Sequence, residues 1–260
     1  MKNRRLARQR GFTLIELLTV SAIIGILAGM LLPAISGVKA KAKKVQCQKE
    51  ITELEGAITA YAADNSRLPV TQETRQAHAK FIDQVPDLRF GNVGVQSFPP
   101  TVSPTPFLNI APVTINPNNA EIIAILMNLT NVAVGYNGST QNVNADFGLN
   151  PKHQTYLQAK QLSAAGPGGV DLSVNNLYPN KTGGVYRDPW GRPYYIVLDM
   201  DYDGRCLSPF YDFANGSSTA IPKYINKPVL IFSAGPDGLI NLGAAQNDKK
   251  TVNADNVYSW

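Results

Sequence analysis

The fold is decided by the stretch Phe12-Thr13-Leu14-Ile15-Glu16-Leu17-Leu18-Thr19-Val20, which opens an apolar run that continues to Ile35. The run is about 24 residues long and holds a single charged residue, Glu16. Because a transmembrane helix needs roughly 20 apolar residues, the run predicts a membrane span over about residues 12–36. A secretory signal would have a shorter apolar core and a small-residue cleavage site after it, so we expect the span to be retained.

Two residues inside the run ask for an explanation. A lone carboxylate in an apolar span costs on the order of 2–3 kcal/mol, so Glu16 implies a specific partner, unless it lies close enough to the end of the span to reach lipid headgroups. Pro33 removes one backbone hydrogen bond, which predicts a bend or a locally melted turn. The alternative is that the helix simply ends there.

The helical pattern continues beyond the run. An apolar stripe recurs at three- and four-residue steps, which predicts an amphipathic helix that docks on a domain; its members are Ile51, Leu54, Ala57, Ile58 and Tyr61. Polar residues fill the other side: Glu50, Thr52, Glu53 and Glu55. Turn-forming residues before Pro69 predict that the helix stops near Asp64. The expected helix therefore covers residues 12–66.

The next region, residues 67–185, contains several Pro- and Gly-rich breaks that interrupt any long periodicity. One apolar stretch, residues 121–128, predicts a short helix. We interpret the region as a loop-rich surface insertion, and no motif in it identifies a ligand.

The last region, residues 186–260, has the pattern of an antiparallel sheet. Asp188-Pro189-Trp190-Gly191 predicts a tight turn, in which Pro presets one dihedral angle and Gly permits the close. Strand-like runs follow at residues 192–199 and 228–233. The expected fold is therefore of the α+β class: a long N-terminal helix followed by a C-terminal antiparallel sheet, with a large insertion between them.

A basic leader ending in Gly11, followed by Phe12-Thr13-Leu14-Ile15-Glu16, resembles the class III signal of type IV prepilins. The resemblance implies that residues 1–11 are a leader, that a prepilin peptidase cuts after Gly11, and that the new N-terminal residue, Phe12, is methylated. It also supplies the partner for Glu16, because this carboxylate would neutralise the Phe12 amine of a neighbouring subunit. Pro33 falls where many pilins carry a helix-bending proline.

The C-terminal blocks resemble the sheet and calcium loop of the major pseudopilins of type II secretion, and Tyr61, Asp64 and Pro69 resemble their helix end. In that family a Ca²⁺ ion ties the last loop to the sheet. The resemblance implies Ser233, Asp237 and Asp255 as ligands, with Asn253 standing where the family often has an aspartate. The alternative is that Asp237-Gly238 forms only a hairpin turn.

A second candidate calcium loop is Asp199-Met200-Asp201-Tyr202-Asp203-Gly204, where carboxylates alternate before a glycine. An EF-hand is excluded because its twelfth position requires Glu and is Phe210 here. A simpler calcium loop at Asp199, Asp201 and Asp203 is left open beside an exposed polar turn.

Charge and composition exclude several classes of function. Five of the 24 Lys and Arg residues lie in the first ten positions, and the rest of the chain has as many acidic as basic residues, which argues against a nucleic-acid-binding protein. With two Cys and two His, the chain lacks the usual material for a disulfide framework or a His-rich metal site. The sequence has no nucleophile elbow, HExxH motif or phosphate loop, so we expect no enzymatic activity.

Taken with the resemblance, these features predict a structural subunit of a type IV pilin-like filament, closest to a pseudopilin of type II secretion. The implied partners are further copies of the chain, the prepilin peptidase, a membrane platform protein and an assembly ATPase. The precursor is expected in the inner membrane as a single-pass protein, and the mature chain in a periplasmic or cell-surface filament. The alternative is a membrane-anchored or filament-borne calcium-dependent binding protein.

Overall fold

The computed structural model describes residues 12–79, 87–91, 118–136, 139–164, 166–172, 183–210, 212–213, 220–221, 223–240 and 252–260. The chain forms two compact units, Met1–Lys43 and Lys44–Trp260. The second unit contains the C-terminal half of the long helix, the predicted insertion and the C-terminal sheet. The 67–185 region is thus not a separate body.

The N-terminal helix α1 spans Leu14–Asn65, close to the predicted 12–66. It is helical through position 33, so it does not end at Pro33. Ser66, with a left-handed φ of 51°, terminates α1 three residues before Pro69, as the turn-forming residues predict. The side chains of residues 31–36 lie outside the described part, and the bend at Pro33 stays a prediction.

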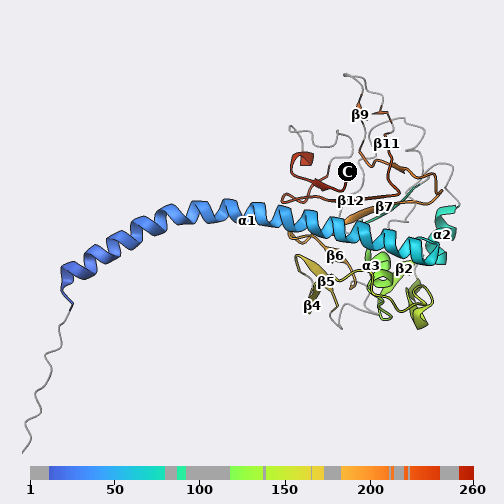
Figure 1. Cartoon of the computed structure of the whole chain (residues 1–260), viewed down its shortest axis with the longest axis horizontal. Coiled ribbons are helices and arrows are strands. Elements are labelled where there is room, and N and C mark those ends of the chain that lie inside the picture. The colour runs from blue at the N-terminus through green and yellow to red at the C-terminus, as the bar shows by residue number, and fades with distance from the viewer. Residues whose placement is uncertain are drawn as a thin grey trace, which may run out of the picture. The chain divides into compact units, whose positions relative to one another are not determined.

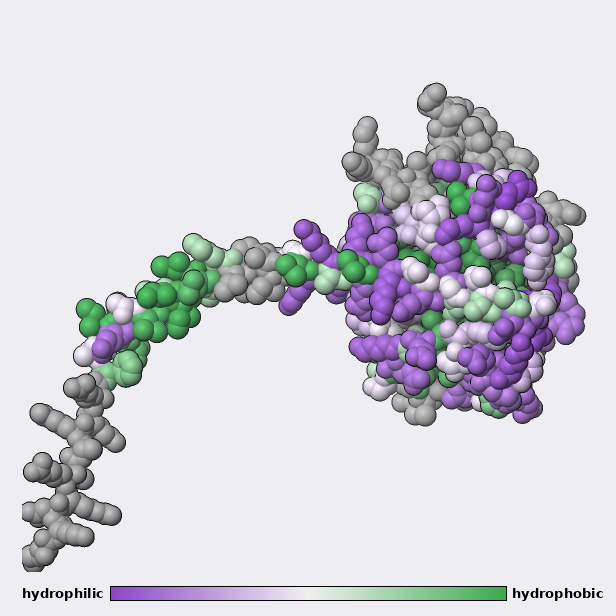
Figure 2. Space-filling view, in the orientation of Figure 1, coloured by the Kyte–Doolittle hydropathy of each residue, from purple (hydrophilic) through white to green (hydrophobic). Residues whose placement is uncertain are grey.

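The first part of α1 carries its apolar side chains on the surface. Figure 2 shows hydrophobic residues along this segment. Leu14 is 84% exposed and Met30 71%, and Phe12, just before the helix, is 83% exposed. Within the described residues, no helix combines the length and apolar character needed to cross a membrane. The span at residues 12–36 therefore remains a prediction.

The main sheet has four strands in the order β1-β7-β12-β13: β1 (Asp87–Phe90), β7 (Tyr195–Asp199), β12 (Val229–Ser233) and β13 (Val257–Tyr258). All neighbouring strands are antiparallel. The strands predicted at residues 192–199 and 228–233 are β7 and β12. Two pairings could not be read from the sequence: β1 lies on one edge, and the chain end returns as β13 beside β12.

The C-terminal half of α1 provides one side of the core. All five residues of the predicted stripe are at most 4% exposed, which confirms the docking face. Glu50, assigned to the polar side, is instead buried, and its carboxylate accepts a hydrogen bond of 2.5 Å from the Tyr194 hydroxyl. The two cysteines, Cys47 and Cys206, are buried free thiols.

Part of the predicted surface insertion is core, which corrects that interpretation. The predicted helix at 121–128 is α3 (Ala120–Leu126), and every residue in it is buried. In the view of Figure 1, α3 and the sheet of β4 (Gln161–Leu162), β5 (Gly169–Asp171) and β6 (Tyr186–Arg187) lie on one side of α1, and β7 and β12 on the other. β1 also comes from this region and joins the main sheet. The Pro- and Gly-rich region therefore contains two elements of the core, α3 and β1.

Smaller elements complete the described part of the second unit. They are α2 (Gln72–Ala79), β2 (Ala133–Tyr136), β3 (Ser139–Asn142), η1 (Ala145–Phe147), β4 (Gln161–Leu162), β5 (Gly169–Asp171), β6 (Tyr186–Arg187), β8 (Cys206–Leu207), β9 (Asp212–Phe213), β10 (Ala220–Ile221), β11 (Tyr224–Ile225) and η2 (Val252–Ala254). Strands β2-β3, β8-β11 and β9-β10 form two-stranded antiparallel pairs.

Candidate functional site

Glu16 has a partner within its own chain. Its Oε2 atom accepts hydrogen bonds from the Thr13 backbone N–H (2.8 Å) and the Thr13 hydroxyl (2.7 Å), and the Glu16 N–H donates to Thr13 Oγ1 (3.3 Å). This reciprocal arrangement is a capping box at the first turn of α1. The Thr-x-x-Glu spacing before an apolar run was the sequence signal for it. Glu16 is thus satisfied as a helix cap in the single chain.

Of the other predicted processing and assembly residues, Phe12 lies next to this cap and Pro33 lies farther along α1. Phe12 precedes the helix and its side chain is 83% exposed. Gly11, the residue before the predicted cut, lies outside the described residues. Pro33 lies within α1, and its side chain is outside the described part.

The end of the chain folds back on the last long strand, as the predicted calcium loop requires. Ser233 pairs with Val257 in the β12–β13 register. The following turn contains Gly235, whose φ is +67°; a Cβ atom there would lie 2.6 Å from the Asp255 carbonyl oxygen. Only glycine permits so close a backbone approach in this conformation. The turn after β12 and the segment before β13 are therefore in direct contact.

The Ser233 side chain already has a hydrogen-bond partner, Asp188, in the turn that follows β6. Its hydroxyl donates to Asp188 Oδ2 (2.5 Å) and accepts a hydrogen bond from the Gly235 N–H (3.0 Å). Asp188 Oδ1 also accepts from the N–H groups of Trp190 and Arg192, so this buried carboxyl ties the predicted turn to β12. Burial raises the Asp188 pKa, and these hydrogen bonds oppose the rise. The Ser233 hydroxyl is therefore engaged within the protein on both its donor and its acceptor side.

Asp237 and Asp255 are neighbours in this loop. Burial and then the charge of Asp237 raise the pKa of Asp255. The Oδ1 atom of Asp255 is buried and has no hydrogen-bond partner within the described part of the chain, whereas Asp237 Oδ1 accepts from the Leu239 N–H (2.8 Å). Asn253 is fully buried, and its Oδ1 accepts from Asn256. Two adjacent carboxyls and an unsatisfied buried oxygen are compatible with a hard cation.

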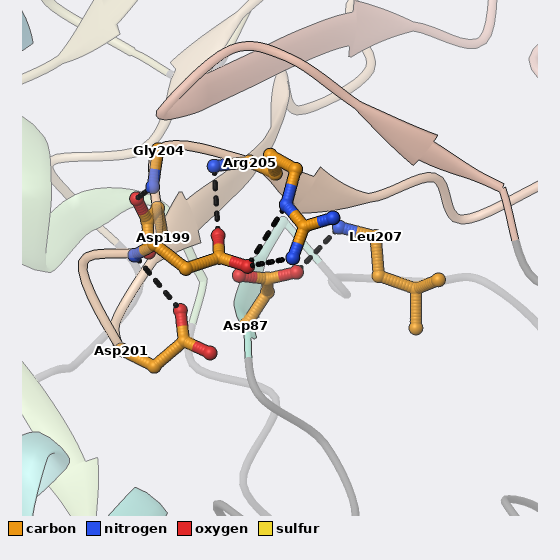
Figure 3. Close-up of polar contacts among 7 residues, drawn as sticks. Asp87, Asp199, Asp201, Gly204, Arg205 and Leu207 are labelled. Atoms are coloured by element: carbon orange, nitrogen blue, oxygen red, sulfur yellow. Dashed lines mark hydrogen bonds and ion pairs between the residues drawn. The ribbon is translucent and has the colours of Figure 1, made fainter.

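The second candidate calcium loop differs from the prediction by two residues: Asp87 joins the carboxylate cluster and Asp203 is not part of it. Asp87, on β1, brings a carboxylate oxygen within 4.8 Å of oxygens from Asp199 and Asp201 (Figure 3). Asp203 is not in this cluster, because its carboxylate forms an ion pair with Arg205 at 2.7 Å. The sequence did not indicate Asp87, because its position opposite Asp199 follows from the pairing of β1 with β7, which no local sequence pattern predicts.

The first residues of the chain match a known sequence family. Residues 6–32 fit the family described as the prokaryotic N-terminal methylation motif. The chain is 44% identical over 70 residues to the type II secretion system core protein G of Klebsiella pneumoniae, a match that covers 27% of this chain and 50% of that protein. The corresponding protein of Escherichia coli strain K12 is 42% identical over 66 residues, covering 25% and 46%.

The similarity extends to more distant bacteria but not to the whole chain. The core protein G of Vibrio cholerae is 38% identical over 74 residues, which cover 28% of this chain and 51% of that protein. The chain thus spans about half the length of the curated relatives it matches. No solved structure shows significant similarity to it. The N-terminal region thus carries a prepilin methylation motif and is similar in sequence to a type II secretion pseudopilin.

Proposed function

We propose that this chain is a pseudopilin: a structural, non-catalytic subunit that loses residues 1–11 and assembles through α1 into a filament of a type II secretion-like system. The observation that carries the proposal is the methylation motif at residues 6–32, placed on a helix whose apolar side chains are exposed. Exposed apolar side chains in such number need a covering, and packed copies of the same helix provide one. The precursor would reside in the inner membrane and the filament in the periplasm or on the cell surface.

Glu16 gives this assembly a register. Cleavage after Gly11 would create a positively charged amine on Phe12, and the Glu16 carboxylate of a neighbouring subunit is its counter-charge. Both hydrogen bonds to the Glu16 side chain end on Oε2, and among the described residues Oε1 receives none. One carboxylate can therefore cap its own helix through Oε2 and bind a cation through Oε1. In a low-dielectric surrounding such a pair fixes geometry more than it adds net stability, because desolvation offsets much of the attraction.

We further propose that Ca²⁺ binds the loop between β12 and β13. The support is the adjacent pair Asp237 and Asp255, with the buried, unpartnered Oδ1 of Asp255. Backbone carbonyls, together with the Ser233 side-chain oxygen if it exchanges one of its present partners, would complete an oxygen ligand set of the kind that calcium prefers. A bound ion would hold the chain end against β12.

The assembly proposal is tested by separating the charge of Glu16 from its capping role. Glu16→Gln removes the charge, yet Gln at this position still forms a capping box. Thr13→Val removes the cap and keeps the charge. In cells that carry the secretion system, both variants should be cleaved, and electron microscopy of sheared material should show filaments with Thr13→Val and few or none with Glu16→Gln.

Two results would count against the proposal. Normal filament yield from Glu16→Gln would show that the charge does not set the register. Absence of any filament that contains the wild-type chain, in cells where other subunits of the system assemble, would contradict the pseudopilin role itself.

A further inference from the structure

The sheet brings carboxylates together where the β1–β7 pair ends. In the antiparallel register Asp87 lies directly opposite Asp199, and Asp201 follows two residues after β7 ends. Like charges directly opposite one another on neighbouring strands destabilise the pair. A strand pairing that opposes two aspartates therefore calls for a compensating cation.

Asp87 is the deepest member of the cluster and lacks a full set of partners. Its side chain is 2% exposed, and Oδ2 accepts a hydrogen bond from the Leu207 N–H. Oδ1 is buried and has no hydrogen-bond partner among the residues that the structure describes. An unsatisfied buried carboxylate oxygen costs more free energy than an ordinary missing hydrogen bond. Asp87 Oδ1 thus marks a position where a ligand would be stabilising.

The geometry of the three carboxyls fits one ion. One oxygen from each of Asp87, Asp199 and Asp201 lies within 4.8 Å of the other two. Oxygens that share a calcium ion at about 2.3–2.6 Å lie at most about 5 Å apart. Figure 3 shows the Asp87 carboxyl beside the turn that carries Asp199 and Asp201. The left-handed φ of Gly204, +81°, closes this turn, and the Gly204 N–H donates to Asp199 Oδ2 (2.8 Å).

The nearby guanidinium of Arg205 is engaged outside the cluster. Arg205 is held by Asp203, whose Oδ2 accepts from both Nε (3.0 Å) and the terminal nitrogen (2.7 Å). Arg205 is therefore not the cation that offsets the carboxylates of Asp87, Asp199 and Asp201.

We propose that Asp87, Asp199 and Asp201 form a calcium site that clamps the edge strand β1 to the turn after β7. The ligand set is all oxygen, which favours a hard cation over zinc or copper. Calcium tolerates irregular coordination by clustered carboxylates, whereas magnesium demands an octahedron and keeps several waters. The site differs from the loop of Asp237 and Asp255 and does not depend on filament assembly. It would attach β1, which follows the α1–α2 region, to the centre of the sheet.

The test counts calcium bound by the purified full-length chain in detergent, by equilibrium dialysis against radioactive calcium. Asp87→Asn and Asp201→Asn should each abolish the same single calcium ion per chain. Asn at position 87 keeps an oxygen for the Leu207 N–H, and Asp201 is exposed, so both variants are expected to fold. Asp203→Asn is the matched control in the same turn and should retain the ion. Asp237→Asn should leave this ion bound whatever the terminal loop does.

A melting experiment checks the clamp. Calcium should raise the melting temperature of the wild type and of Asp203→Asn relative to chelator. In Asp201→Asn, which lacks the Asp87–Asp199–Asp201 site, this rise should be smaller than in Asp203→Asn. The proposal is overturned if the wild type binds no calcium beyond the ion lost in Asp237→Asn. It is also overturned if Asp87→Asn retains full binding while Asp203→Asn loses it, because the site would then be a surface loop without β1. An equal rise of the melting temperature with magnesium alone would contradict the choice of calcium.

Discussion

The contact between α1 and the sheet predicts a measurable cost for removing one hydroxyl. Tyr194 is fully buried, and its hydroxyl donates to Glu50 Oε2 at 2.5 Å, while Gln46 donates to Oε1 at 2.8 Å. Tyr194→Phe leaves the ring in place and deletes one of these two bonds. A hydrogen bond to a charged group contributes about 1.5–3 kcal/mol, and one to a neutral group about 1 kcal/mol.

The protonation state of Glu50 sets which value applies. Burial raises the Glu50 pKa, and the bonds from Tyr194 and Gln46 oppose the rise. Well above that pKa the carboxylate is ionised, and Tyr194→Phe should destabilise the chain by about 2 kcal/mol, or about 4–8 °C in melting temperature for a domain of this size. As the pH falls through the Glu50 pKa, the cost should shrink to about 1 kcal/mol.

Thermal unfolding followed by circular dichroism, on the full chain in detergent at several pH values, provides the assay. Tyr224→Phe is the matched control, because Tyr224 is 44% exposed and its ring, which Phe keeps, lies against Arg205. Repeating the change in a Glu50→Gln background should remove the pH dependence of its cost. A Tyr194→Phe variant that melts with the wild type at alkaline pH, or a cost that grows on acidification, would refute the reasoning.

Two further predictions concern single positions. The folded-state pKa of Glu50 is raised above its unfolded value, so the stability of the wild type should fall as the pH rises from about 4.5 through that folded pKa. Glu50→Gln should flatten this part of the plot of stability against pH. An unchanged slope would exclude Glu50 as its source. Gly235→Ala should destabilise the folded chain more than Gly204→Ala. Both glycines have a positive φ, which costs an L-residue about 1–2 kcal/mol. Of the two, only position 235 would bring the new Cβ against a backbone oxygen, that of Asp255 at 2.6 Å. Equal losses of melting temperature in the two variants would mean that the turn after β12 can move away from Asp255.

Local patterns predicted the elements whose causes are local. The stripe of α1 follows the helical period, and the turn at Asp188 follows from Pro189 and Gly191; the structure confirms both. The helix end near Asp64 and the two central strands follow from similar short-range signals. The capping box of Glu16 follows from an equally local signal, the three-residue spacing of Thr13 and Glu16 before an apolar run.

Contacts set by long-range pairing could not be predicted. Asp87 meets Asp199 only because β1 takes the edge beside β7, and the region that contains β1 is dominated by Pro and Gly. The same cause explains the incorrect surface assignment of α3, since its burial depends on the elements that surround it. Glu50 was assigned to the polar side because helical periodicity gives its direction but not the presence of the Tyr194 hydroxyl.

The measurement that tests the pseudopilin role most directly is intact-mass spectrometry of the chain purified from cells that contain a prepilin peptidase. The proposal predicts a mature protein that begins at Phe12 with one added methyl group. Gly11→Val, which crowds the residue before the cut, should remain a full-length precursor that begins at Met1. A wild-type chain that keeps residues 1–11 in the presence of an active peptidase, or a Gly11→Val variant that yields methylated Phe12, would contradict it.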